Sequence, residues 1–173
     1  VDIGGTSTDI SLIRDGEPMI RPDGKVGGYT VRVPMVDVNA IGSGGGSIAW
    51  IDPAGGLRVG PHSAGSDPGP ACYGRGGKNA TVTDASLVLG YLDPAYFAGG
   101  TLALDPDRAA TAIKSEIAEP LGMSVEQAAL GIHQNSRAQI ACDARGFDRQ
   151  RDAVEFLSRR RGGGGTEPVH RAR

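Results

Sequence analysis

Short runs of apolar residues, separated by turn-forming residues, dominate the first third of the chain. Residues 1–14 are predicted to form two antiparallel strands joined by a turn at Gly4–Thr8, at the mouth of a cleft, because apolar runs flank a segment of glycine and hydroxyl residues. Asp15-Gly16 marks a second turn after the apolar run at 10–13. Alternating apolar residues at 29–38 predict another strand, which Pro34 should interrupt because proline cannot donate to a β-ladder. Residues 1–59 are therefore predicted to be β-rich.

A second glycine-rich segment, residues 42–47, lies between two strand-like runs. The runs at 48–52 and 57–59 predict a hairpin with Trp50 packed on one face. The glycine-rich segment is either a flexible linker or a structured loop that lies near a ligand or faces Asp9. We favour the structured loop, because a flexible linker has no purpose between two short strands.

A helical period replaces the alternating pattern in the second half of the chain. The predicted helices are 85–92 with Thr83 or Asp84 as N-cap, 107–119 opened by Asp105 or Pro106, and 125 to about 145 opened by a capping box from Ser124 to Gln127. Pro120 to Met123 should separate the last two. We expect these two helices to pack on one side of the sheet through Ile113, Ile117 and Ile132, with His133 on the polar face.

Amino-acid composition and net charge indicate which binding partners and which cellular compartment to expect. The chain has 173 residues, enough for one domain, and its 28 glycines imply many close backbone approaches. A formal net charge of −2 argues against nucleic acid or an anionic membrane as partner. Two cysteines are too few for a disulfide framework, and the sequence has no signal peptide or membrane-spanning run. We therefore expect a cytoplasmic protein.

Candidate chemistry concentrates in the first nine residues. Gly4 and Gly5 allow a close backbone approach, and Thr6, Ser7 and Thr8 add hydroxyl donors, a combination that favours anions such as phosphate. The two flanking carboxylates, Asp2 and Asp9, would need a cation beside a phosphate, and Mg²⁺ is the natural choice. The alternative is a glycine–threonine hairpin with two solvated carboxylates.

Residues 60–80 have little propensity for helix or strand, which is typical of functional or disordered loops. His62, Asp67 and Cys72 suggest a metal site, and Cys72 also suggests a nucleophile. None has paired-ligand spacing, however. We favour a buried packing thiol for Cys72 and structural hydrogen bonds for His62 and Asp67.

The two ends of the chain carry separate expectations. The first residue, Val1, falls inside a predicted strand, so we expect a fragment that starts within a longer protein. Residues 149–173 are basic and low in complexity, including an arginine and glycine run at 159–165. We interpret this tail as disordered or artefactual, for example through a reading-frame slip.

Four motifs occur in an informative order. They are Asp2-Ile-Gly-Gly-Thr-Ser-Thr-Asp9, Asn39-Ala-Ile-Gly-Ser-Gly-Gly-Gly-Ser47, Gly60-Pro-His-Ser-Ala-Gly-Ser-Asp-Pro-Gly-Pro-Ala-Cys-Tyr-Gly74 and Thr81-Val-Thr-Asp-Ala85. Together they resemble the hydantoinase A / 5-oxoprolinase family, which also holds acetone carboxylase β-type subunits. The resemblance covers residues 1 to about 148.

The resemblance implies an α/β fold of the actin/hexokinase/Hsp70 ATPase class, which is ribonuclease H-like. This chain would be part of the second ATPase subdomain, β-rich first and then helical. It implies ATP and Mg²⁺ as cofactors, with phosphate held by the residues of the two glycine segments: Gly4, Gly5, Thr6, Ser7, Thr8, Gly44, Gly45 and Gly46. Asp2 and Asp9 would be catalytic, acting through the metal or orienting water.

The implied activity is ATP-dependent opening of a small cyclic amide, such as 5-oxoproline or a hydantoin, by phosphorylation of the lactam. A hydantoinase B-type subunit or domain is the implied partner. Two alternatives remain: a subunit fragment of an acetone-carboxylase-type enzyme, and a non-catalytic binding remnant. With only one of the two phosphate turns present, we expect this chain alone to be inactive.

Overall fold

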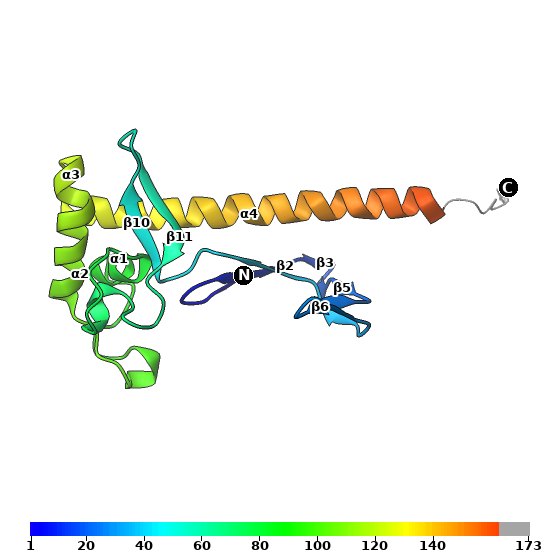
Figure 1. The fold of residues 1–173 in the computed structure, drawn as a ribbon, viewed down its shortest axis with the longest axis horizontal. Helices are drawn as coiled ribbons and strands as arrows, with labels where there is room; N and C mark the ends of the chain where they lie inside the picture. The colour runs from blue at the N-terminus through cyan, green and yellow to red at the C-terminus, as the bar shows by residue number, and fades with distance from the viewer. Residues whose placement is uncertain (163–173) are drawn as a thin grey trace.

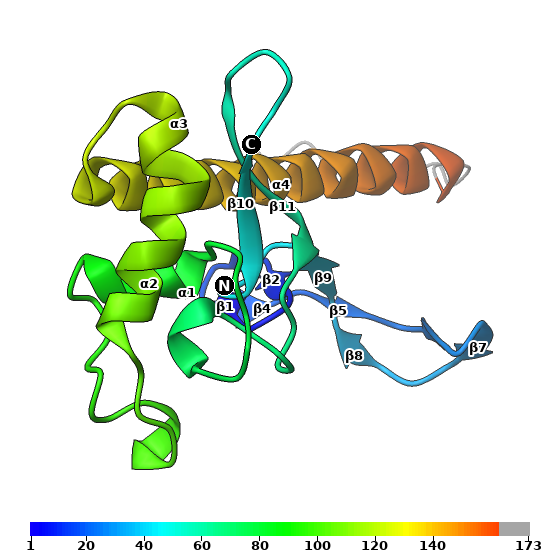
Figure 2. The ribbon, with the colours of Figure 1, turned by 60° about the vertical axis from the view of Figure 1, so that its left-hand side comes forward.

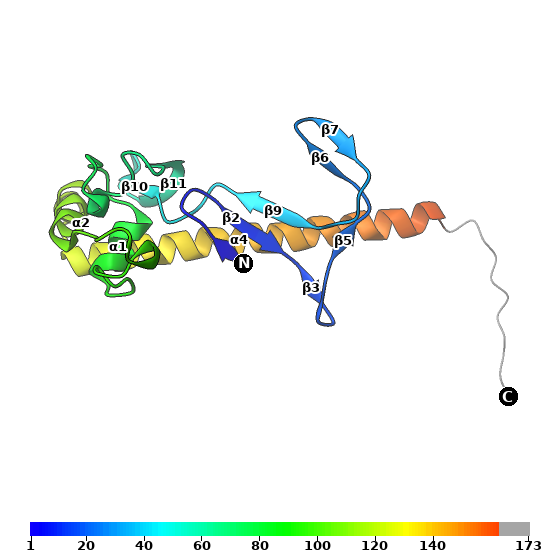
Figure 3. The ribbon, with the colours of Figure 1, turned by 90° about the horizontal axis from the view of Figure 1, so that it is seen from below.

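One long helix forms the axis of the molecule, and two groups of elements lie along it (Figure 1). The computed structural model describes the backbone of residues 1–162 and the side chains of residues 1–149. At the start of the long helix lie the other helices and a β-hairpin, and short strands run beside its middle part (Figure 3).

The first half of the described chain consists of short antiparallel strands, as predicted. They are β1 Asp2–Ile3, β2 Thr8–Ser11, β3 Ile13–Arg14, β4 Glu17–Pro18, β5 Ile20–Arg21, β6 Gly24–Val26, β7 Tyr29–Val31, β8 Met35–Val36, β9 Val38–Ile41, β10 Ser47–Ile51 and β11 Leu57–Ser63. One three-stranded sheet has the order β1-β2-β9, and the pairs β3-β4, β5-β8, β6-β7 and β10-β11 form two-stranded sheets. The predicted interruption at Pro34 lies between β7 and β8.

Two predicted turns are confirmed by their geometry. The turn between β1 and β2 joins antiparallel strands in which Asp2 pairs with Asp9 and Ile3 pairs with Thr8. Asp15 and Gly16, between β3 and β4, have φ angles of 51° and 83°. Both residues are therefore left-handed, as a two-residue hairpin turn requires.

The β10–β11 hairpin is also confirmed, and it crosses the long helix (Figure 2). The prediction for Trp50 is only half right, because its ring stays 41% exposed. Its indole N–H donates to the carbonyl of Gly60 at 2.6 Å. The indole therefore closes the hairpin through its polar edge instead of filling the core.

The helices follow the predicted order with different bounds. They are α1 Val82–Val88, α2 Pro106–Ile113, a π-helical turn at Lys114–Ala118, α3 Glu119–Leu121 and α4 Val125–Gly162, with 3-10 turns at Ala71–Tyr73 and Ala98–Gly100. Thr81, not Thr83 or Asp84, caps α1. Pro120 lies inside α3 and does not end the helix. The capping box from Ser124 to Gln127 is present, with both reciprocal hydrogen bonds.

Helix α4 continues well beyond the predicted end near residue 145. Its backbone is helical to Gly162, so no break falls at position 149. The remainder of the predicted disordered tail, residues 163–173, lies outside the described residues. Among the helices that the structure describes, none is both long and apolar enough to cross a membrane.

The main core lies between the hairpin, α1, α2 and the start of α4. Ile113, Ile117 and Ile132 are fully buried there, as predicted. Small residues fill most of the remaining volume: Ala49, Ala71, Ala80, Ala85, Ala112, Ala118, Ala128 and Ala129. Helices and hairpin can approach closely because these side chains are short, and α1 packs on both α2 and α4.

A buried carboxylate fastens the loop before α1 to the start of that helix. Asp84 is fully buried and accepts hydrogen bonds from the amide of Cys72 at 2.8 Å and from that of Ala71 at 3.3 Å. It also accepts from the amide of Thr81 at 3.0 Å and from its hydroxyl at 2.7 Å. The Thr81–Asp84 pair is a capping box that the sequence analysis missed.

Replacing Asp84 by asparagine should destabilise the fold strongly. Asparagine has one acceptor oxygen, and its amino group would face donors, so buried amides would lose their partners. We expect a loss of about 3 kcal/mol or more in the free energy of unfolding, measured by urea denaturation. Asp93→Asn is the control, since its exposed carboxylate accepts only from Ala95 N and asparagine keeps that bond. Equal stability of the two variants would contradict the role of Asp84.

Candidate functional site

The two glycine-rich segments of the sequence meet in the structure. We call residues 4–7 the first glycine turn and residues 42–47 the second glycine loop. The amide of Gly45 donates to the carbonyl of Gly4 at 2.9 Å, and that of Gly46 to Gly5 at 2.6 Å. The second loop is therefore structured, as predicted. It faces the first turn and not Asp9, whose neighbour in the sheet is Ala40.

Close contact explains why the second loop is built from glycine. A Cβ atom on Gly44 would lie 2.7 Å from the carbonyl oxygen of Gly4, and one on Gly46 would lie 2.9 Å from that of Gly5. A Cβ on Gly45 would lie 2.7 Å from the hydroxyl of Thr83. These distances are shorter than carbon–oxygen contact allows, so no other residue fits without movement.

The amides of the three central glycines of the second loop are already hydrogen-bonded within the described chain. Gly44 donates to the hydroxyl of Ser47 at 2.9 Å, while Gly45 and Gly46 donate to the first turn. Contact of these three glycines with phosphate stays a prediction, and their amides are not free to make it in this structure. They support the first turn from behind instead.

Thr8 also differs from its predicted role. Its side chain is fully buried, and its hydroxyl donates to the carbonyl of Ser43. Gly4 uses its own amide to close the turn, donating to Ser7 at 2.8 Å. Thr8 and Gly4 thus shape the turn, and the exposed groups of the turn belong to the residues between them.

The middle of the first turn does offer free donors. Gly5, Thr6 and Ser7 are exposed, and within the described part of the chain their amides and the two hydroxyls make no hydrogen bond. Three successive N–H groups and two hydroxyls form a concentrated set of donors that suits a phosphate. This part of the predicted phosphate site is brought together by the fold.

Two carboxylates flank the turn on one face. Asp2 and Asp9 are directly opposite in the antiparallel register, so their Cβ atoms lie about 5 Å apart. Both are exposed, and neither forms an ion pair with a described side chain. Like charges in this position are unfavourable, and a divalent cation between them would remove the repulsion.

A cation there would take few ligands from the described residues. No group of three or more His, Cys, Asp or Glu side chains gathers among them. Two carboxylates, with water and phosphate oxygens completing the shell, match the way in which Mg²⁺ is usually held. Asp2 and Asp9 therefore fit Mg²⁺ better than a metal that needs a full protein cage.

The loop at 60–80 does not supply a second site. His62 and Asp67 are exposed, and their side chains make no hydrogen bond in the described structure, so the predicted structural bonds are absent. Cys72 is fully buried beside Leu87, Leu104 and Ala109. Its role as a packing thiol is confirmed.

The surroundings of Cys72 also oppose a nucleophilic role. Burial raises the pKa of the thiol well above its usual range, and the nearby Asp84 carboxylate raises this pKa further. The thiolate that a nucleophile needs is therefore disfavoured.

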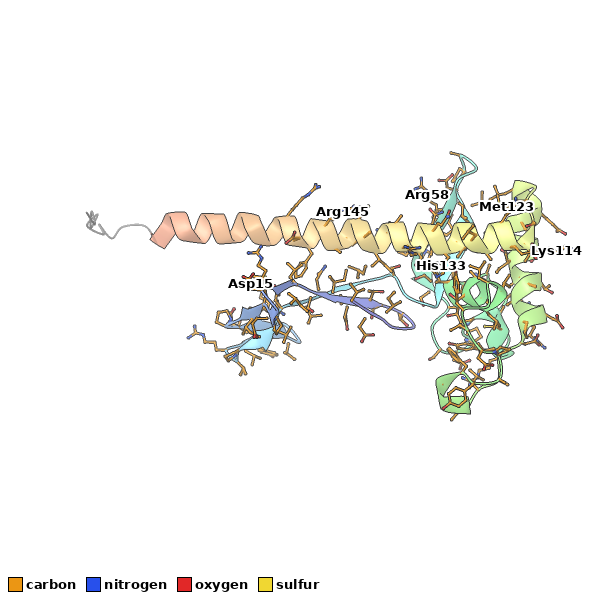
Figure 4. The ribbon with its side chains drawn as sticks, turned by 180° about the vertical axis from the view of Figure 1, so that it is seen from behind. Asp15, Arg58, Lys114, Met123, His133 and Arg145 are labelled. Atoms are coloured by element: carbon orange, nitrogen blue, oxygen red, sulfur yellow. The ribbon has the colours of Figure 1, made fainter. Side chains whose placement is uncertain are left out.

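A cavity of about 320 Å³ lies behind the first turn, which we call the turn pocket. Its wall includes Gly4, Gly5 and Gly45, and across from them Tyr73, Phe97 and His133. His133 was predicted to lie on the polar face of its helix rather than to be a ligand, and the structure places it at the edge of that face. It is half-buried and packs edge-on against Tyr91, with ring centroids 5.1 Å apart, where α4 passes over α1 (Figure 4).

The sequence analysis missed this pocket because its wall comes from segments far apart in the chain. Only the position of His133 one residue after the buried Ile132 could have hinted at a half-buried side chain.

Comparisons with known proteins agree with the motifs. The profile of the hydantoinase/oxoprolinase family matches residues 1–172, which extends beyond the residues on which the resemblance rested. Caprolactamase subunit alpha of Pseudomonas jessenii is 53% identical over 132 residues, or 76% of this chain and 19% of that protein. 5-oxoprolinase 1 of Arabidopsis thaliana is 46% identical over 96 residues, or 56% of this chain and 7% of that protein.

Solved structures show the same arrangement of strands followed by helices. The ATP-dependent caprolactamase of Pseudomonas jessenii superposes with a TM-score of 0.70 at 49% identity, and nucleotide-free acetone carboxylase with a TM-score of 0.69 at 38% identity. Each match covers 84% of this chain and 21% of the other. The chain thus spans about a fifth of the length of these relatives.

The two cysteines should differ sharply in reactivity. Cys142 is exposed and Cys72 is buried with a raised pKa. At pH 8, we expect Ellman's reagent to modify one thiol of the folded chain rapidly and the second only in guanidinium chloride. Cys142→Ser should remove the rapid phase. Two rapid equivalents in the folded protein would contradict the packing role of Cys72.

Gly44→Ala and Gly5→Ala form a matched pair. The first introduces a Cβ at 2.7 Å from Gly4 O, whereas a Cβ on Gly5 meets nothing within 4 Å. Overpacking of this kind costs about 1–3 kcal/mol, so we expect Gly44→Ala to lower the Tm by about 3–10 °C. Gly5→Ala should leave it unchanged or slightly higher, as measured by circular dichroism. A stable Gly44→Ala protein would show that the two segments do not meet as described.

Proposed function

The chain belongs to the hydantoinase/oxoprolinase family, and on this premise we propose that it is the phosphate-binding part of an enzyme that opens a small cyclic amide with ATP. Relatives whose names indicate hydrolysis of a cyclic amide include a caprolactamase, described as ATP-dependent, and 5-oxoprolinases. We further propose that its fold is a portion of an actin/hexokinase/Hsp70-like ATPase domain, in a cytoplasmic protein.

The observation that carries the proposal is the donor set of the first glycine turn. Within the described residues, the amides and hydroxyls of Gly5, Thr6 and Ser7 make no hydrogen bond, and Asp2 and Asp9 lie beside them without an ion-pair partner. Phosphoryl transfer depends on positioning and on charge neutralisation, more than on covalent chemistry by the protein. A rigid turn with preorganised donors and a place for a cation supplies both.

Each residue has a defined part in this proposal. The turn would hold the terminal phosphates of ATP, and Asp2 and Asp9 would hold Mg²⁺, which neutralises charge on the phosphates. The second glycine loop would keep the turn rigid through the hydrogen bonds from Gly45 and Gly46. Rigidity matters because donors that must reorganise stabilise a transition state less.

The proposed reaction opens the ring in three steps. The carbonyl oxygen of the lactam attacks the γ-phosphorus of ATP, and the bond from phosphorus to the ADP oxygen breaks with its electron pair leaving on ADP. Water adds to the activated ring carbon, and the carbon–nitrogen bond breaks as nitrogen takes up a proton. The resulting acyl phosphate reacts with a second water to give carboxylate and inorganic phosphate.

A carboxylase subunit is the second candidate. Acetone carboxylase beta subunit of Xanthobacter autotrophicus is 42% identical over 132 residues, and the same turn would serve to activate a ketone with ATP. In both cases we propose a further subunit or domain of the hydantoinase B type as partner, and we expect a chain of this length to be inactive alone. A non-catalytic binding role remains the third alternative.

The test uses a protein of family length that carries this chain. Asp2→Asn, Asp9→Asn and the double variant should each lower kcat for ATP-dependent ring opening by about 100-fold or more, as loss of one preorganised group does elsewhere. Asp15→Asn is the control, because Asp15 is exposed and asparagine accepts its left-handed conformation equally well. Coupled assays of ADP release with 5-oxoproline, caprolactam, hydantoin and acetone plus bicarbonate would separate the two enzyme candidates.

Unchanged kcat and unchanged Mg²⁺ dependence in the double variant would overturn the metal assignment. An intact, folded protein that binds ATP but turns over none of these substrates would favour the non-catalytic alternative.

A further inference from the structure

The turn pocket carries chemistry that the proposed reaction does not use. It lies on the side of the β1–β2 ribbon to which Ile3 points, and Asp2 and Asp9 point to the other side, because residues alternate along a strand. A molecule in this pocket would therefore touch the first turn from behind, without occupying the face where the carboxylates stand.

Two buried hydroxyls line the pocket without protein partners. Ser136 is 5% exposed and Thr83 is 8% exposed, and neither side chain makes a hydrogen bond with the described residues. Neither hydroxyl oxygen is among the buried and unsatisfied side-chain atoms of the described residues, so both are accessible from the cavity. Two accessible hydroxyls in one cavity can hydrogen-bond a polar ligand or water.

The opposite wall suits a ring. Tyr73 and Phe97 pack together with ring centroids 5.8 Å apart, and Leu92 and Ile140 extend the apolar surface. A volume of about 320 Å³ lies at the small end of ligand pockets, which span about 300–1,000 Å³. A single-ring molecule is the size that fits.

Charge at the rim selects for an anion. Arg137 lines the pocket and is exposed, and its guanidinium makes no ion pair or hydrogen bond with the described side chains. His133 stands one helical turn before it, and no aspartate or glutamate lines the pocket. Arginine pairs with carboxylates through two parallel hydrogen bonds, so a carboxylate is the natural partner here.

We propose that the turn pocket is a binding site for a small aromatic or cyclic monocarboxylate, distinct from the phosphate site. The ring packs against Tyr73 and Phe97, and the carboxylate pairs with Arg137. The pocket wall includes Gly4, Gly5 and Gly45. A bound ligand should therefore change the environment of the hydrogen bond from Gly45 to Gly4. The binding step does not depend on the ATP reaction, so its test is separate.

Benzoate is the probe, and benzamide is its uncharged counterpart. In ¹H–¹⁵N NMR titrations of the chain, benzoate should shift the amide signals of Gly4, Gly5 and Gly45, and benzamide should bind at least about tenfold more weakly. Arg137→Gln should weaken benzoate binding by about tenfold, which is a difference of about 1.4 kcal/mol. It should leave the affinity for benzamide unchanged.

Arg145→Gln is the matched control, since Arg145 is exposed on the same helix outside the pocket (Figure 4). Ser136→Val, which fills the pocket and removes a hydroxyl, should abolish the shifts while the remaining spectrum stays folded. Absence of shifts with benzoate, equal binding of benzamide, or equal loss in Arg145→Gln would each overturn the proposal.

Discussion

A short series of hydrogen bonds links the two glycine segments to helix α1 and to the loop before it. Gly45 donates to Gly4, and the carbonyl of Gly45 accepts from the amide of Thr83 at 2.7 Å. The next residue, Asp84, then fixes the amide of Cys72. Four segments that are far apart in sequence therefore meet within a few residues. The bond between Asp84 and Cys72 joins two fully buried residues, so losing it would leave an unpaired polar group in the interior.

This constraint divides the glycine-rich motifs into two kinds. Gly44, Gly45 and Gly46 are glycines because another backbone lies within contact distance of where a Cβ would be. A Cβ atom on Gly5 would have no neighbour within 4 Å, because Gly5 lies on the exposed side of the turn. The second glycine loop thus supports the first glycine turn, and the first turn exposes its donors to solvent. The second loop keeps the donors of the exposed turn aligned, although those donors make no hydrogen bond with the described residues.

Strand pairing sets the chemistry of the two faces of the turn. An antiparallel register places Asp2 opposite Asp9 and Ile3 opposite Thr8. Because side chains alternate, one face carries the carboxylates and the other carries the wall of an apolar pocket. Helix α4 completes that pocket with His133 and Arg137. The two faces of the turn therefore correspond to the two ligands that we propose, a metal–phosphate group on one side and a ring-shaped carboxylate on the other.

The sequence alone determined the β-rich first half, the 1–14 hairpin, the core isoleucines of the later helices and the family, because periodicity, turn residues and motif order are local. It favoured a structured second glycine loop but not its contact with the first turn or the burial of Thr8, since glycine indicates close approach without saying what approaches. It missed the Thr81–Asp84 clamp and the half-burial of His133. Only the tertiary structure could decide these points: burial and hydrogen-bond partners belong to pairs of distant segments, and no local pattern encodes which segments will meet.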